Sequence, residues 1–213
     1  MSTALMEPLA PSVEFSTLAS DDQIERTVRA LEANHMEALV VDSGDEARAR
    51  VLGLIPAGAQ VYNSVSRTLE LIGLTADIEQ ATAFQPARPM IRALDRSTQM
   101  HEIRRLVSSP EVLVGSVQAI TEQGQVLLAS ATGNQLAAAA FGASRVIWVA
   151  GTQKIVRDLD EGVRRVREYC QPIEDVRTRQ VYGQPSAINK LLVVNADLPG
   201  RITVVLVKQK LGV

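Results

Sequence analysis

Apolar runs of strand length alternate with segments of helical periodicity along most of this chain. Residues 38–41 and 146–150 are two of the apolar runs, and Ile24, Val28 and Leu31 recur at helical spacing before the first of them. Strands of a parallel sheet are covered on both faces and are therefore apolar throughout, whereas amphipathic helices repeat every three to four residues. The alternation predicts an α/β fold with a mostly parallel sheet flanked by helices.

Local signals predict several element boundaries. Ser20 and Gln23 have the spacing of a capping box, so the first helix is expected to begin at Ser20. Residues 121–124 form a turn between two apolar strands, which predicts an antiparallel hairpin element. After this turn, the strand 126–128 is expected to lie beside the strand 112–114.

The clearest amphipathic helix begins near residue 159. Its core stripe consists of Leu159, Val163, Val166 and Cys170. Two pairs of opposite charge, four residues apart, are expected on its outer surface: Glu161 with Arg165, and Arg164 with Glu168. The polar segment 171–184, which contains Pro172, is interpreted as a linker.

The chain is long enough for one substantial domain. Of its 213 residues, 46% are hydrophobic and 22% are charged, which is ordinary for a soluble globular protein. Residues 1–18 are rich in Ser, Thr, Pro and Ala without periodicity, and are interpreted as a flexible tail that becomes ordered only against a partner. Residues 19–213 are expected to form a single domain.

Charge and composition exclude several classes of function. The net charge is -2 without long blocks of one sign, so nucleic-acid binding is not expected. One cysteine, Cys170, cannot form an internal disulfide or ligate an iron–sulfur cluster, and His35 and His101 show no metal spacing. The sequence therefore encodes no recognisable cofactor or metal site. We expect a cytoplasmic protein, because neither a targeting segment nor a membrane span is recognisable.

The corner at residues 130–135 is the first candidate for a ligand site. Thr132, Gly133 and Asn134 precede an Ala-rich helix expected over residues 135–141, and Ser130 lies just before them. A glycine at a helix start allows close backbone approach, and the first N–H groups of the helix can bind an anion. Ordinary helix capping by Thr and Asn is the alternative.

Polar residues at predicted strand ends are the second set of candidates. Asn63, Ser66 and Thr68 follow the strand 60–62, and Lys154 follows the strand 146–150. The carboxyl edge of a parallel sheet is the usual ligand crevice, so these side chains are expected to converge there. Arg201 could supply a second cation, or could form a salt bridge that fixes its turn.

Glu122 is the only candidate for acid–base or nucleophilic chemistry that the pattern suggests. It lies in the predicted hairpin turn, where a carboxylate near a helix N-terminus could act on a bound metabolite. The alternative is a solvated turn carboxylate, and burial decides between them.

Five short motifs in order give the chain a resemblance to the LUD domain family, best known from lactate-utilisation proteins. They are Ser66-x-Thr68-Leu69-x-x-Ile72-Gly73-Leu74, Ala119-Ile120-Thr121-Glu122-x-Gly124, Thr132-Gly133-Asn134, Gly151-x-x-Lys154-Ile155-Val156 and Pro199-Gly200-Arg201-Ile202-x-Val204-x-Leu206-Val207. The match runs from about residue 20 to Gly212. The resemblance implies a three-layer α/β domain like those of the CoA-transferase and ribose-5-phosphate isomerase superfamily.

The resemblance also implies a role in oxidising L-lactate to pyruvate, with iron–sulfur proteins as redox partners. Larger members carry cysteine-rich segments, whereas a single cysteine here would leave electron transfer to another subunit. The nucleophilic glutamate of CoA transferases has no clear counterpart. The first hypothesis is therefore a protein that binds a small anionic metabolite.

Other interpretations stay open at this stage. The protein could be a non-catalytic accessory or assembly subunit, a metabolite sensor, or an enzyme acting on a CoA ester or a sugar phosphate. The sequence also leaves open whether the chain forms a homo-oligomer.

Overall fold

The computed structural model describes residues 9–213, and within them the strands form two sheets. All neighbouring strands of the six-stranded sheet are parallel, which confirms the predicted α/β class. In order across this sheet, the strands are β1 (Glu37–Val41), β10 (Ile202–Val207), β7 (Arg145–Gly151), β4 (Val112–Gly115), β2 (Gln60–Asn63) and β3 (Gln85–Pro86).

The second sheet is mixed and contains the predicted antiparallel hairpin. Its strands, in order, are β8 (Ile155–Val156), β5 (Ala119–Thr121), β6 (Val126–Ser130) and β9 (Lys190–Val194). The hairpin joins β5 to β6 through the turn at Glu122. The expectation that residues 126–128 lie beside residues 112–114 is wrong, because β4 already has β2 and β7 as its two neighbours.

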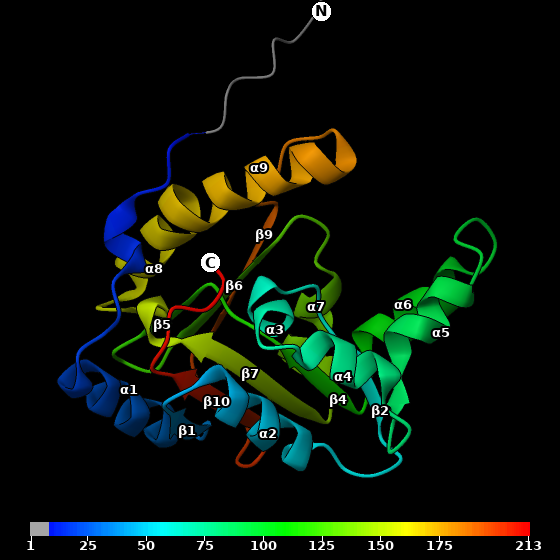
Figure 1. Ribbon diagram of the computed structural model, residues 1–213, viewed down its shortest axis with the longest axis horizontal. Coiled ribbons are helices and arrows are strands. Elements are labelled where there is room, and N and C mark those ends of the chain that lie inside the picture. Colours follow the sequence, from blue (N-terminus) through cyan, green and yellow to red (C-terminus); the bar gives the residue numbers. More distant parts are fainter. Residues whose placement is uncertain (1–8) are drawn as a thin grey trace, which may run out of the picture.

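Helices cover both faces of the parallel sheet (Figure 1). One face packs against α2 (Gly44–Leu54), α3 (Arg67–Leu71) and α4 (Leu74–Gln80). The other face packs against α1 (Asp21–Ala33), α5 (Ala87–Ala93), α6 (Met100–Ser108), α7 (Asn134–Ala137) and the second sheet.

The alternation of side chains along the central strands explains this layering. In β7, Val146 and Trp148 belong to the core on the α1 side, whereas Ile147 and Val149 belong to the core on the α2 side. Successive side chains of a strand point to opposite faces, so a strand that is apolar throughout supplies both cores. Trp148 is fully buried, as its place in an apolar run predicts.

The capping box that the sequence predicts at the first helix is present. The Ser20 hydroxyl accepts a hydrogen bond from the Gln23 backbone N–H at 3.3 Å, and the Gln23 side chain accepts one from the Ser20 N–H at 3.0 Å. These two bonds satisfy N–H groups that have no partner within a helix, so α1 begins directly after Ser20.

The interpretation of residues 171–184 as a linker is wrong. Helix α8 (Leu159–Arg165) runs through a π-helical turn (Val166–Cys170) directly into α9 (Gln171–Tyr182). Pro172 lies in the first turn of α9, directly after the π-turn, where the helix loses a hydrogen bond without ending. Helix α9 crosses the top of the view in Figure 1, above β9.

Residues 12–16 pack on the π-turn that joins α8 to α9. Of residues 1–18, for which a flexible tail is expected, residues 1–8 lie outside the described part of the chain. Residues 13–16 form a 3₁₀ turn, and Phe15 is buried against Tyr169 and Cys170. The Ser12 backbone N–H donates to the Glu168 carbonyl at 2.8 Å. Within residues 9–213, no helix is both long and apolar enough to cross a membrane.

Candidate functional site

The order of the strands locates a crevice at the β2–β4 pair. Strand β3 adds to the sheet on one side of β2, whereas β4, β7 and β10 add on the other side. Successive strands of the chain are therefore added to the sheet in opposite directions on the two sides of this pair, which makes it a topological switch point. Ligands of open α/β sheets bind at such a point, beyond the carboxyl ends of the strands.

A cavity of about 620 Å³ lies there. Its wall comes from the start of α3, the connection between β4 and β5, the corner after β6, the turn after β7, and α9 with the loop that follows it. Six of the candidate residues from the sequence lie in this wall: Ser66, Thr68, Ser130, Thr132, Asn134 and Lys154. The fold thus brings together candidate residues from three separate segments.

Lys154 is the buried cation of the cavity wall. It lies in a 3₁₀ turn directly after β7, and its side chain is 2% exposed. The ammonium group donates to the Thr68 hydroxyl at 3.1 Å, the Ser116 hydroxyl at 2.9 Å and the Val117 carbonyl at 3.0 Å. Among residues 9–213, no Asp or Glu forms an ion pair with Lys154.

A second buried cation lies directly behind the wall. The Arg165 guanidinium donates to the Gln118 carbonyl, to the Cys170 sulfur at 3.0 Å and to the Phe15 carbonyl at 3.5 Å. Gln118 and Cys170 are themselves wall residues. The expected surface pair of Glu161 with Arg165 is wrong: Glu161 pairs with Arg157, and Arg165 is fully buried. The Arg164–Glu168 pair is confirmed.

Burial and mutual repulsion set the electrostatics of these cations. Loss of hydration lowers the pKa of Lys154 to about 7, and the positive charge of Arg165 acts in the same direction. Burial also raises the pKa of the Cys170 thiol, although the two cations oppose that rise. A lysine whose pKa is near neutrality changes its charge within the physiological range of pH.

In the corner at residues 130–135, the backbone N–H groups are hydrogen-bonded to side chains of the corner itself. The Gly133 N–H donates to the Ser130 hydroxyl at 2.9 Å, the Asn134 N–H to the Thr132 hydroxyl at 3.5 Å and the Gln135 N–H to the Asn134 side chain at 2.8 Å. The expected anion-binding amides are therefore already paired, as in the capping alternative. The helix begins at Asn134, and residues 138–142 form a π-turn.

Gly133 has the backbone conformation that the corner needs. Its φ is 84°, which L residues with a side chain rarely adopt, and a Cβ there would lie 2.6 Å from Cδ of Lys190. Gly133 is not itself a wall residue of the cavity, so its role in the structure is to shape the corner.

Two residues near β2 have different environments from those expected. Ser66 caps α3 by accepting from the Leu69 N–H at 3.4 Å, and its side chain still lines the cavity. Asn63 is fully buried but lies outside the wall, with its amide donating to Glu79 of α4 at 3.4 Å. The alternation along β2 explains this, because Val61 and Asn63 share the face toward α4.

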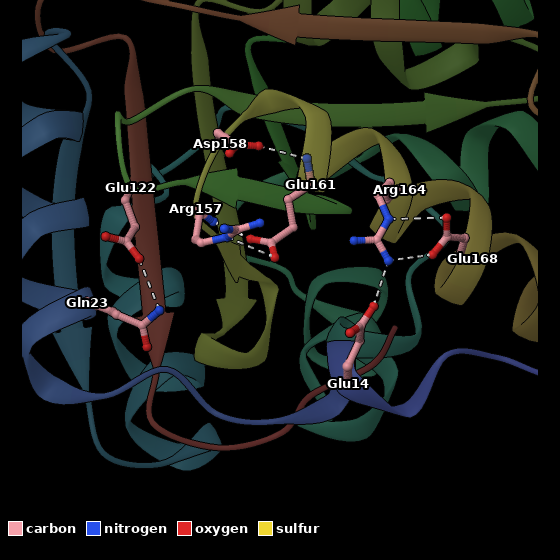
Figure 2. A network of polar contacts seen from close by, with 8 residues as sticks. All are labelled: Glu14, Gln23, Glu122, Arg157, Asp158, Glu161, Arg164 and Glu168. Carbon is pink, nitrogen blue, oxygen red and sulfur yellow. Dashed lines mark hydrogen bonds and ion pairs between the residues drawn. The ribbon is translucent and has the colours of Figure 1, made fainter.

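Glu122 lies outside the cavity wall, contrary to the expectation of a site carboxylate. It accepts from the Arg26 guanidinium at 2.7 Å and from the Gln23 side chain at 3.0 Å, both on α1. Figure 2 shows Glu122 turned toward Gln23. The hydrogen bond from Arg26 lowers the pKa of Glu122, so this carboxylate is charged and paired at neutral pH.

If an anion binds in the cavity, replacing Glu122 with glutamine should leave its affinity unchanged, because Glu122 lies outside the wall. We expect ligand affinity within about twofold of the wild type, and a loss of stability below about 1 kcal/mol because Arg26 is half exposed. Ligand-induced thermal shifts of the two proteins measure both. A loss of affinity of tenfold or more would show that Glu122 acts on the ligand.

Arg201 also lies outside the cavity wall. It precedes β10, at the amino end of the parallel strands, whereas the cavity is at their carboxyl ends. Its guanidinium pairs with Asp197 and donates to the carbonyls of Ala138, Ala139 and Ala143. The salt-bridge alternative thus describes Arg201, which holds the π-turn after α7.

Several wall residues lie outside the set that the sequence predicts. Ser116 directly follows β4, so the rule that selected the residues after β2 would also have found it. Arg177 and Thr178 are on α9, which was interpreted as a linker. The described residues contain no cluster of three or more His, Cys, Asp or Glu suited to a metal ion.

Together, the fold and the cavity define a three-layer α/β domain with a buried cation at the carboxyl ends of its parallel strands. The profile of the LUD domain matches residues 24–207. The chain belongs to the LUD domain family.

One solved structure of low sequence identity shares this fold. A crystal structure of a DUF162 family protein from Deinococcus radiodurans is 14% identical, with a TM-score of 0.56, covering 90% of this chain and 99% of that chain. A structure of eIF2B delta from Chaetomium thermophilum is also 14% identical, with a TM-score of 0.32 and coverage of 67% and 54%. The comparison with curated proteins finds no match.

Proposed function

We propose that the protein binds a small anionic metabolite in the cavity, with the ammonium group of Lys154 as the charge that attracts it. The observation that carries this proposal is a fully buried lysine in the wall whose partners are two hydroxyls and a carbonyl, all uncharged. Burying a charge is costly unless an opposite charge accompanies it. A carboxylate or phosphate in the cavity would supply that charge.

The family favours particular ligands for the first test. The LUD domain family is associated with lactate utilisation, so L-lactate and its oxidation product pyruvate come first. The cavity of about 620 Å³ is within the range of about 300–1,000 Å³ that is usual for small-molecule sites, and it has room for a larger acid. Lactate oxidation also needs an electron acceptor, for which we propose an iron–sulfur partner subunit.

Anion binding should depend on Lys154 and on pH. The affinity should fall about tenfold between pH 6 and pH 8, because the group with a pKa of about 7 loses its charge over this interval. At a free ligand concentration ten times the Kd, binding should stabilise the protein by about 1.4 kcal/mol. Thermal unfolding with L-lactate, pyruvate, ribose 5-phosphate and acetyl-CoA measures these effects and separates the ligand classes.

Lys154→Met tests the site, and Lys190→Met is its matched control. Lys190 is exposed and close to the corner at Gly133, but it lies outside the cavity wall. We expect the shift to disappear in the first variant and to persist in the second. A confirmed ligand that shifts Lys154→Met as much as the wild type would rule out this site.

A further inference from the structure

Anion binding alone does not account for the environment of Lys154. A permanent charge such as that of arginine would hold an anion at every pH, whereas burial and the neighbouring Arg165 make this lysine easy to deprotonate. Lysines that are desolvated, or placed near another cation, act as nucleophiles toward carbonyl groups. The two glutamates of the wall, Glu70 and Glu174, are each paired with an arginine on their own helix.

The hydrogen bonds around the amine are compatible with its neutral form. The Ser116 hydroxyl is close to the Val149 carbonyl, at 2.6 Å, and donates to it. The Thr68 hydroxyl donates over a longer distance, 3.3 Å, to the Leu211 carbonyl, and it lies 3.2 Å from the Ser116 hydroxyl. When Lys154 is neutral, the Thr68 hydroxyl can rotate and donate to the amine, while Ser116 and the Val117 carbonyl accept its two N–H groups.

We propose that Lys154 is a catalytic residue, the nucleophile of the cavity, and that it forms a Schiff base with 2-oxo acids. This inference rests on the proposed function, because it takes the bound metabolite to be a carboxylate with a neighbouring carbonyl. A protonated Schiff base carries the same positive charge as the ammonium group it replaces. The adjacent carboxylate of a 2-oxo acid therefore keeps an opposite charge beside it.

The reaction needs no oxidant or other reagent. The lone pair of the Lys154 nitrogen attacks the ketone carbon and forms a carbinolamine. The new C=N bond then replaces the C–O bond, and the two amine hydrogens leave with the carbonyl oxygen as water. The proton that the ammonium group released to solvent before the attack returns to the imine nitrogen, which gives the protonated Schiff base. The Thr68 hydroxyl, 3.1 Å from the nitrogen, is placed to pass a proton to the departing oxygen.

Reductive trapping with pyruvate tests the proposal on the full chain. The protein is incubated with pyruvate and sodium cyanoborohydride near pH 7.5, and the adduct is mapped by peptide mass spectrometry. The chain has four lysines, Lys154, Lys190, Lys208 and Lys210, so the modified residue is readily assigned. We expect labelling of Lys154 to be at least about tenfold faster than that of Lys190, because more of its amine is neutral at this pH.

The controls separate this proposal from the proposed function. Lys154→Arg should lose the adduct and Lys190→Arg should keep it, while L-lactate, which has no ketone, should give none. An adduct at Lys154 in the wild type supports the proposal even where Lys154→Arg fails to fold. Pyruvate that causes a Lys154-dependent thermal shift without an adduct at Lys154 overturns the Schiff base and leaves anion binding intact. Labelling spread evenly over the lysines, or none at saturating pyruvate, also overturns it.

Discussion

The free energy of unfolding should rise by about 2 kcal/mol between pH 7 and pH 9, and Lys154→Met should abolish this rise. The pKa of Lys154 is about 7 in the folded protein, against an ordinary value of 10.5. Between these values the unfolded chain binds more protons than the native state, so stability increases with pH. Urea unfolding at several pH values measures how the free energy of unfolding of each protein changes with pH.

The predicted rise in the free energy of unfolding ends at pH 9 because titration of Cys170 lowers this free energy at higher pH. Burial raises the pKa of its thiol above the ordinary value of 9, so the unfolded chain loses that proton first and stability falls at higher pH. Lys190→Met should retain the wild-type slope. A slope in Lys154→Met equal to that of the wild type would mean that Lys154 is not titrating in the native state.

Replacing Arg165 with methionine should destabilise the protein by about 3 kcal/mol, because it removes charged hydrogen bonds and leaves the buried carbonyls of Gln118 and Phe15 without their donor. The loss should also raise the pKa of Lys154, since Arg165 lowers it. Chemical unfolding at pH 8.5 gives the stability, and the pH slope described above gives the direction of the pKa change.

Arg164→Met is the matched control for this variant. Arg164 is the neighbouring residue, but its side chain is 49% exposed and pairs with Glu14 and Glu168 at the surface, as Figure 2 shows. Its replacement should cost below about 1 kcal/mol. Equal losses of stability in Arg165→Met and Arg164→Met would contradict this prediction. They would mean that the cost of burying the Arg165 guanidinium cancels the stability that its hydrogen bonds contribute.

Sequence patterns predict the parts of this fold that depend only on residues close together in the chain. The apolar run around Trp148 indicates a strand covered on both faces, and Ser20 with Gln23 indicates a helix start, because each depends only on neighbouring residues. The position of Lys154 at the carboxyl edge also follows from the strand before it. Its burial does not, since α3 and the β4–β5 connection that enclose it are distant in sequence.

Distant contacts explain the residues that the sequence placed incorrectly. Arg165 is outside the apolar stripe of its helix, and its buried guanidinium donates to the carbonyl of Phe15, which comes 150 residues earlier. Glu122 has a partner on α1, and Arg201 has its partners at a π-turn. Of the partners of these three side chains described above, only Asp197, which pairs with Arg201, is a nearby charge of the kind that a local pattern can indicate.

The position of β10 between β1 and β7 has a consequence for the nascent chain. Strand β1 pairs residue by residue with β10, from Glu37 with Thr203 to Val41 with Val207. During synthesis, β1 and the inner edge of β7 must therefore remain without this shared neighbour until about residue 207 has left the ribosome. Apolar strand edges exposed for so long favour aggregation, so the yield of folded protein should depend on chaperones that shield them.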